Sequence, residues 1–227
     1  MERKGYYLVF EGPDGSGKST QYARTLQFLN EFGFKKGKDI VEVREPGGTR
    51  IGEQVRRILL DPDNADLTPR AELLLFNASR AQLVKTVIEP AVNEGKIVVS
   101  DRSYIASIAY QIIGGGEPID EGEKVILFAI HNFMPDHVYL LDVMPEIGLL
   151  RRGVGKDRIE QKSLEYHHSL RNGYLLYARA NTDLIKVIDG TPPVEDVWLQ
   201  VKSDFENRVL KEWLNRSGRK LKRRKKK

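Results

Sequence analysis

Cysteine is absent from this sequence of 227 residues, and that absence removes several classes of protein at once. Without thiols the chain forms no disulfide framework, no thiolate zinc site and no cysteine nucleophile. Long apolar runs are also lacking, since no uncharged stretch approaches the ~18 residues that span a bilayer. The first ten residues hold too few apolar side chains for a signal peptide. We therefore expect a cytoplasmic protein that does not act at a membrane.

The C-terminal end is basic and lacks acidic side chains. Residues 216–227 carry nine Lys and Arg and no Asp or Glu, and they account for the net charge of +5. The rest of the chain carries 28 basic against 32 acidic side chains, a net charge of −4. The basic character therefore belongs to a tail rather than to a groove on the folded part. We expect one domain over residues 1–213 and a disordered tail over 214–227.

Hydrophobic residues make up 40% of the chain, enough for a buried core. Strand-like and helix-like segments alternate, which is typical of a parallel sheet covered by helices. Strands are expected at 6–10, 39–43, 96–100, 137–142 and 184–188. Helices are expected at about 18–32, 51–60, 69–92, 103–113 and 120–133, on both sides of 153–155, and from about 194 onward. The pattern predicts an α/β fold with a five-stranded parallel sheet and helices on both faces.

A phosphate-binding loop is the most specific motif. Residues 12–19, GPDGSGKS, fit G-x-x-x-x-G-K-[ST] and lie between an expected strand and an expected helix. Glycines let backbone N–H groups turn toward phosphate oxygens, and the helix N-terminus adds positive potential. We expect Lys18 to reach the β- and γ-phosphates and Ser19 to bind Mg²⁺. The expected ATP-binding residues are Gly12, Pro13, Asp14, Gly15, Ser16, Gly17, Lys18, Ser19 and Thr20.

Two further segments suit a site for a nucleotide base. The segment REPGGT at 44–49 follows the second strand, where ligands bind in open α/β sheets. In LLFNASRAQ, a spacing of four places Phe76 and Arg80 on one helix face. A ring beside a set of N–H donors can stack on a base and bond its edge. Each segment alone is also compatible with a plain turn, or with a core phenylalanine and a solvated arginine.

Two more segments suit phosphate chemistry. Asp101 and Arg102 follow the third strand, where a carboxylate can hold Mg²⁺ and an arginine can clamp a phosphate. Ser107, Tyr110 and Gln111 share one face of the next helix. The segment RRGVGKDR at 151–158 is a basic, glycine-broken connection that suits a lid over transferring phosphates. A surface ion pair and a solvated charge run are the simpler interpretations.

Together these segments resemble the thymidylate kinase family, which phosphorylates dTMP to dTDP with ATP. The matching stretches lie in the family's order over about residues 6–190, and they are FEGPDGSGKST, REPGGT, LLFNASRAQ, DRSYIASIAYQ, DRIE and VIDG. The combination of REPGGT with DR…AYQ is the specific part of the resemblance. It implies a nucleoside-monophosphate-kinase-like P-loop fold with a lid at about 151–160. It also implies Mg²⁺ as cofactor, ATP and dTMP as partners, and a homodimer.

The resemblance assigns roles to individual residues. Asp14 would bond the deoxyribose 3′-hydroxyl, Phe76 would stack on thymine, and Arg80 would donate to its 4-oxo group. Arg102 would hold the acceptor phosphate, and Tyr110 would occupy the space of a ribose 2′-hydroxyl. Ser107 and Gln111 would lie along the base. The residues expected to bind the substrate are Asp14, Arg44, Phe76, Arg80, Arg102, Ser107, Tyr110 and Gln111.

The loop at 12–19 has no arginine between its glycines, which resembles the subtype in which lid arginines assist transfer. The residues expected to act in catalysis are Lys18, Arg102, Arg151, Arg152 and Arg158, and those expected to hold the metal are Ser19 and Asp101. One departure is Ala106, where relatives often carry serine.

Two other functions are also compatible with the sequence. A deoxynucleoside kinase acting on thymidine would need a general base, for which Glu11 or Glu45 are candidates. A phosphate acceptor needs none, because its second pKa is about 6 and it is already an anion at neutral pH. The other alternative is a nucleotide-binding protein that associates with nucleic acid through its basic tail, which can supply weak, nonspecific contact.

Overall fold

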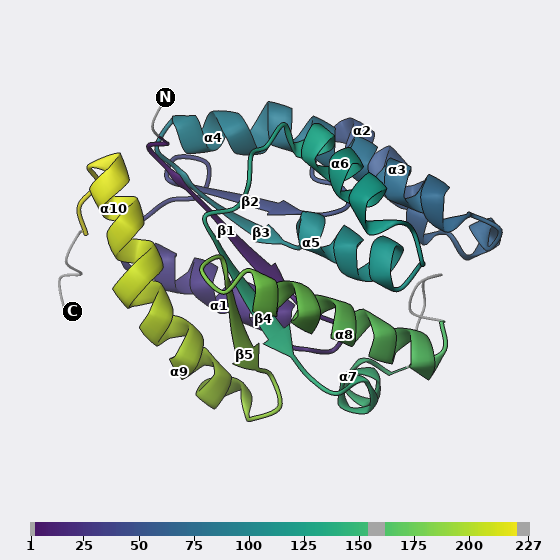
Figure 1. Ribbon diagram of the computed structural model, residues 1–227. Coiled ribbons are helices and arrows are strands. Elements are labelled where there is room, and N and C mark those ends of the chain that lie inside the picture. Colours follow the sequence, from purple (N-terminus) through teal and green to yellow (C-terminus); the bar gives the residue numbers. More distant parts are fainter. Residues whose placement is uncertain (1–2, 154–161, 222–227) are drawn as a thin grey trace.

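The computed structural model describes residues 3–153 and 162–221, which form one five-stranded sheet (Figure 1). Its order is β2-β3-β1-β4-β5, and all neighbouring strands are parallel. The strands are β1 (Tyr6–Glu11), β2 (Ile40–Arg44), β3 (Ile97–Asp101), β4 (His137–Asp142) and β5 (Ile185–Asp189). The central strand β1 is buried at every position, as a strand covered on both faces must be. The predicted five-stranded α/β fold is confirmed.

Helices cover both faces of the sheet, as Figure 1 shows. One face carries α1 (Lys18–Glu31), α9 (Val194–Asp204), the π-helical η4 (Phe205–Leu210) and α10 (Lys211–Ser217). The other carries α2 (Arg50–Leu60), α3 (Pro69–Leu83), η2 (Val84–Ile88), α4 (Glu89–Asn93), α5 (Tyr104–Ser107), η3 (Ile108–Ile113), α6 (Ile119–Ile130) and α8 (Leu164–Ala180). A short 3₁₀ turn, η1 (Pro62–Asn64), follows α2, and α7 (Pro145–Arg152) follows β4.

Strand alternation divides the core into two layers. In β1, Tyr7 and Val9 face the larger helical layer, while Leu8 and Phe10 face the layer of α1 and α9. Both sets are apolar because the strand has no solvent-facing side. The carboxyl ends of the parallel strands therefore form one edge of the sheet, where polar residues can meet.

Local sequence explains where the helices begin. The hydroxyl of Thr49 accepts from the Gly52 N–H at the start of α2, and Thr68 caps α3 in the same way. The helix expected at 69–92 is present, but it includes the π-helical turn η2 before Pro90. Proline lacks an N–H and its ring clashes with the carbonyl four residues back, which accounts for the irregular turn.

The C-terminal helix ends at the edge of the sheet opposite the strand carboxyl ends. Trp213 is fully buried, and its indole N–H donates to the Gly95 carbonyl at 3.0 Å. Arg216 bonds Asp136 at 2.7 Å, and Arg219 pairs with Asp39. The expected boundary at 213 therefore falls inside α10, because this anchor and its arginines continue the packing. Within the described ranges, no helix is long and apolar enough to cross a membrane.

Candidate active site

The loop between β1 and α1 has the backbone that its glycines allow. Gly12, Gly15 and Gly17 have φ values of 144°, 72° and 89°, which L-residues with side chains rarely adopt. A Cβ on Gly15 would also overlap the carbonyl oxygen of Gly148 on α7. The phosphate loop therefore packs directly against α7, and the strand–loop–helix arrangement expected from the sequence is present.

Two cavities flank this loop. One, of about 740 Å³, runs along Gly15, Ser16, Gly17 and Thr20 toward the segment after β5. The other, of about 270 Å³, lies at the carboxyl ends of the strands, and its lining includes Asp14, Arg44, Phe76, Asp101, Arg102 and Tyr110. Lys18, Ser19 and Arg152 line both cavities. Two ligands bound in the two cavities would thus meet at these three side chains.

A buried charge cluster lies where the cavities meet. Asp14 Oδ1 is 2.6 Å from Arg102 Nη2 and 3.3 Å from Lys18 Nζ. Burial alone would raise the pKa of Asp14, but Arg102 and Lys18 hold that pKa below its ordinary value. Burial and the charge of Arg102 lower the pKa of Lys18. Two cations share one carboxylate, so the cluster carries excess positive charge and suits an anionic ligand.

Arg102 has a constrained backbone as well as a partly buried side chain. Its φ is 74°, in the left-handed region that favours glycine. Its N–H donates to the Phe10 carbonyl at 2.9 Å, and its carbonyl accepts from Ser100 Oγ at 2.6 Å. The guanidinium also bonds the Tyr174 hydroxyl at 3.1 Å. Such backbones cost about 1–3 kcal/mol and cluster at functional sites.

Behind Arg102, Glu11 is fully buried, and both of its carboxylate oxygens accept hydrogen bonds. Its Oε1 accepts from the N–H and the hydroxyl of Ser103 at 2.6 and 2.9 Å, and its Oε2 accepts from Tyr174 at 3.0 Å. Burial raises the pKa of Glu11, although Arg102 and these donors oppose the rise. The carboxylate orients its neighbours and does not face either cavity lining.

The far end of the smaller cavity suits a flat ring. Phe76 and Tyr110 line it together with Ala106 and Gln111. The Gln111 amide nitrogen donates to Glu72 at 2.6 Å, while its Oε1 is buried without a hydrogen-bond partner in the described part of the chain. Ala106 faces the cavity, so the departure from serine noted in the sequence removes a hydroxyl from its wall.

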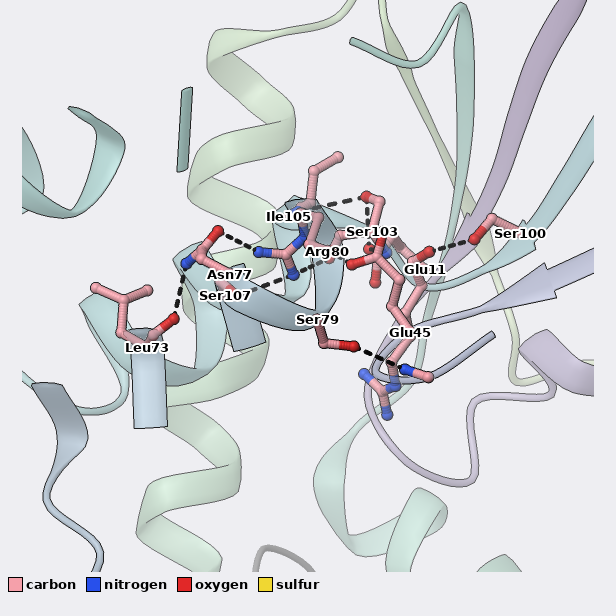
Figure 2. A network of polar contacts seen from close by, with 12 residues as sticks. Glu11, Glu45, Leu73, Asn77, Ser79, Arg80, Ser100, Ser103, Ile105 and Ser107 are labelled. Atoms are coloured by element: carbon pink, nitrogen blue, oxygen red, sulfur yellow. Dashed lines mark hydrogen bonds and ion pairs between the residues drawn. The ribbon is translucent and has the colours of Figure 1, made fainter. Parts of the chain in front are cut away.

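Arg80 lies in the wall behind the cavity, and Figure 2 shows it among its polar partners. It is 1% exposed, and its Nε bonds Glu45 at 2.6 Å. Its Nη1 donates to Asn77 at 2.6 Å, and its Nη2 to Ser107 Oγ at 3.0 Å and to the Ser103 carbonyl at 3.1 Å. Arg80 and Ser107 are therefore next to the ring-binding end without forming its surface.

Hard oxygen ligands lie beside the phosphate loop. Ser19 Oγ is 3.1 Å from Asp101 Oδ2, and Asp101 Oδ1 is buried with no hydrogen-bond partner among the described residues. Those residues contain no group of three or more His, Asp or Glu that could hold a metal. One hydroxyl and one carboxylate fit Mg²⁺, which binds few protein ligands and completes its shell with phosphates and water.

Comparison with known proteins adds family information to this geometry. The thymidylate kinase family model matches residues 10–201. The chain belongs to the thymidylate kinase family. It is 44% identical to the thymidylate kinase of Symbiobacterium thermophilum, over 86% of this chain and 90% of the relative. It is 41% identical to that of Lactobacillus helveticus, over 91% and 98% of the two chains. The crystal structure of thymidylate kinase from Ehrlichia chaffeensis shares the fold, with a TM-score of 0.73, 28% identity, and coverage of 88% and 97%.

The lid arginines expected from the thymidylate kinase resemblance occupy different places. Arg151, at the end of α7, donates to the carbonyl oxygens of Gly190 and Thr191 at 2.7 and 2.8 Å. Arg151 lines only the larger cavity, whereas Arg152 lines both cavities. Arg158 and most of the expected lid at 151–160 lie outside the described residues.

The remaining candidates also lie around the two cavities of this thymidylate kinase family member. Arg44 lines the smaller cavity at its open side, where its Nη2 is 3.0 Å from Glu53. Gly12 and Pro13 shape the loop without lining either cavity. The sequence interpretation missed Tyr174 and Glu72. Both are ordinary helix residues in the sequence, and only the packing of distant elements brings them to the site.

Proposed function

We propose that this chain transfers the γ-phosphoryl group of ATP to the phosphate of dTMP in an in-line reaction. The observation that carries the proposal is the meeting of the two cavities at Lys18, Ser19 and Arg152. ATP occupies the larger cavity with its phosphates on the glycine loop, and dTMP occupies the smaller one. The product is dTDP, the activity of the thymidylate kinase family to which the chain belongs.

The acceptor needs no general base. The second pKa of a phosphate monoester is about 6, so at neutral pH dTMP already presents an anionic oxygen. Catalysis then consists of aligning two anions and neutralising the charge that separates them. Lys18 and Arg102 supply that charge at the junction, and Asp14 holds both cations in place.

The phosphate and sugar of dTMP belong near Arg102. Its guanidinium borders the cavity and can bind the acceptor phosphate bidentately, while Asp14 accepts from the 3′-hydroxyl. Tyr110 lies 3.4 Å from Asp14 through its hydroxyl, so its ring closes the space beside the sugar. A ribose 2′-hydroxyl would have to enter that space. Arg44 adds a cation at the open side of the cavity.

The base belongs against Phe76, at the apolar end. The free acceptor Oε1 of Gln111 suits the N3–H of thymine. Arg80 is the residue we assign to the 4-oxo group; its Nη1 donates one hydrogen to Asn77, and because the guanidinium lies behind the cavity wall, the assignment requires the bound base to reach past the present lining. Ser107 supports the assignment by holding the guanidinium from behind.

Mg²⁺ is the proposed cofactor. Ser19 and Asp101 would hold it, directly or through water, beside the junction of the cavities. When bound, the ion would supply positive charge against the phosphates of ATP. Asp101 is the last residue of β3, next to Arg102, so the strand end positions the metal carboxylate and the phosphate clamp together.

Arg152 is the lid cation that we expect to act on the transferred group, because it borders both ligands. Arg151 is held against the segment after β5 and suits the donor nucleotide instead. Arg158 stays a third candidate. These roles are the ones expected for the subtype that has lid arginines and no arginine in its phosphate-binding loop.

A kinase of thymidine is the less favoured alternative. Transfer to a sugar hydroxyl needs a base, yet Glu11 is engaged by Ser103 and Tyr174, and Glu45 is paired with Arg80. An association with nucleic acid as the main function is also less favoured. The basic segment that follows the paired Arg219 adds weak, nonspecific contact with polyanions in our proposal, and the enzyme is cytoplasmic.

A homodimer is proposed through the face of α6. Phe128 is 89% exposed there, and Leu127 is exposed next to it on the same helix. Single exposed apolar residues are ordinary, but an almost fully exposed phenylalanine next to an exposed leucine favours a protein contact. Phe128→Asp is expected to yield a monomer in sedimentation experiments. An unchanged sedimentation coefficient would exclude this face as the interface.

The proposed reaction is tested by coupled ADP release with Mg·ATP and, separately, dTMP, dUMP, dCMP, dGMP and thymidine. We expect strong turnover with dTMP, weak but measurable turnover with dUMP, and turnover near background with the others. A single methyl group separates dTMP from dUMP, so that discrimination is only about 10–200-fold. Turnover of thymidine without dTMP would overturn the proposal.

A further inference from the structure

A buried carboxylate with no part in phosphoryl transfer lies beside the base-binding end of the smaller cavity. Glu72 on α3 is 2% exposed, and its Oε1 is 2.6 Å from the amide nitrogen of Gln111 on η3, which is 1% exposed. Glu72 does not line the cavity, whereas Gln111 does. The pair thus joins a cavity residue to a buried group behind it.

This contact fixes which end of the Gln111 amide faces the ligand. A carboxylate has no hydrogen to donate, so the nitrogen of the amide must point toward Glu72. The oxygen is then directed to the other side. Oε1 of Gln111 is buried and has no hydrogen-bond partner in the described part of the chain. A buried acceptor without a donor is unfavourable, and its natural complement is an N–H group on a ligand.

We propose that Glu72 is a positioning residue that sets base selectivity by holding the Gln111 amide with its oxygen toward the base. The inference rests on the proposed function, because it takes the ligand to be a pyrimidine monophosphate. Thymine and uracil carry a hydrogen on N3, and cytosine carries a lone pair there. With the amide fixed, cytosine would place one acceptor against another, and the amide could not turn over to relieve the contact.

The variant Glu72→Gln removes the constraint at nearly constant volume. Its amide can donate or accept, so the Gln111 amide gains a second orientation with its nitrogen toward the base. We expect the ratio of kcat/KM for dTMP to that for dCMP to fall about 10–100-fold. Arg80 continues to oppose the 4-amino group, so dTMP remains the better substrate. The ratio of dTMP to dUMP should stay unchanged, because both bases carry the N3 hydrogen.

A matched control and a rescue separate positioning from mere support of the fold. Glu121→Gln on α6 removes a carboxylate whose side chain is 71% exposed, and it should alter neither ratio. The exchange Glu72→Gln with Gln111→Glu reverses donor and acceptor between the two positions. The new carboxylate keeps an oxygen toward the base, so the double variant should recover most of the preference for dTMP over dCMP.

Each outcome of these measurements either supports or overturns the positioning role of Glu72. An unchanged dTMP to dCMP ratio in Glu72→Gln would overturn the positioning role, whether dTMP turnover stays intact or falls equally on all three nucleotides. Should Glu72→Gln fail to fold, judged by its thermal midpoint, the exchange variant carries the test, and absence of recovered selectivity would refute the inference. If the unmodified enzyme did not phosphorylate dTMP, the proposed function itself would fail, which is a distinguishable result.

Discussion

The pair of Arg80 and Glu45 offers the sharpest test of the energetics of the site. Their side chains are 1% and 4% exposed, and Arg80 makes four hydrogen bonds to its surroundings. Replacing one member of a buried ion pair costs about 3–5 kcal/mol, because the other charge is left without a partner. We therefore expect Arg80→Met to lower the free energy of unfolding by about that amount.

The thermal midpoint should fall accordingly, by about 6–20 °C for a chain of this size. Urea unfolding of Arg80→Met and of the double variant Glu45→Gln with Arg80→Met gives the comparison. Arg80→Met leaves the Glu45 carboxylate without its partner, and the double variant removes that carboxylate as well. Its free energy of unfolding should therefore fall by only about 0–2 kcal/mol. Additive losses in the double variant would refute the reasoning, because they would mean that the two charges do not interact.

The pH dependence of Arg80→Met provides a second check. Burial raises the pKa of Glu45, and Arg80 is the main group that opposes the rise. Without Arg80 the folded-state pKa moves further above the unfolded value of about 4.3. A raised carboxyl pKa contributes stability at low pH that is lost as pH rises through the folded pKa. The penalty of Arg80→Met should therefore be smaller at pH 5 than at pH 8, and a penalty independent of pH would contradict this assignment.

Three further outcomes follow from the loop and its surroundings. Gly148→Ala would place a methyl group against the Asp14 carbonyl, so it should raise the KM for ATP and cost about 1–3 kcal/mol of stability, measurable by kinetics and urea unfolding. Ser19→Ala should raise the Mg²⁺ concentration for half-maximal rate, with little change in the thermal midpoint. Arg152→Ala should lower kcat about 10²–10³-fold, whereas Arg151→Ala should mainly raise the KM for ATP. Equal kinetic profiles for the two arginine variants would contradict their different positions.

Much of the fold was predictable because the apolar runs and the Gly and Pro residues that end them indicate the same strand and helix boundaries. Strand β4 (His137–Asp142) begins and ends where its apolar run predicts. Strand β3 extends one residue past the apolar run, to Asp101, because the backbone of this acidic residue still pairs with β1 and β2. The break of the helix at 69–93 into α3, η2 and α4 depends on how Pro90 is accommodated, and hydrophobic periodicity does not report that.

Some residues of the candidate site could likewise be predicted from the sequence, and others could not. Lys18, Phe76 and Gln111 lie in motifs whose spacing carries a mechanism, so the sequence points to them directly. Tyr174 reaches Glu11 from an element 163 positions away, and no local pattern predicts that meeting. The sequence predicts that Arg80 contacts the base, whereas its burial against Glu45 depends on the packing of α3 on the strand end and is not visible in the motif.

The backbone of Arg102 places stability and chemistry in opposition at one position. Its left-handed conformation is one that glycine adopts without strain and that asparagine tolerates, yet neither can bind a phosphate as arginine does. Relief of this strain, about 1–3 kcal/mol, would favour Arg102→Gly or Arg102→Asn. Either change would also leave the carboxylate of Asp14 without its partner at 2.6 Å, which costs at least as much. The strained backbone therefore persists because the residue that would relax it is one that the charge cluster does not tolerate.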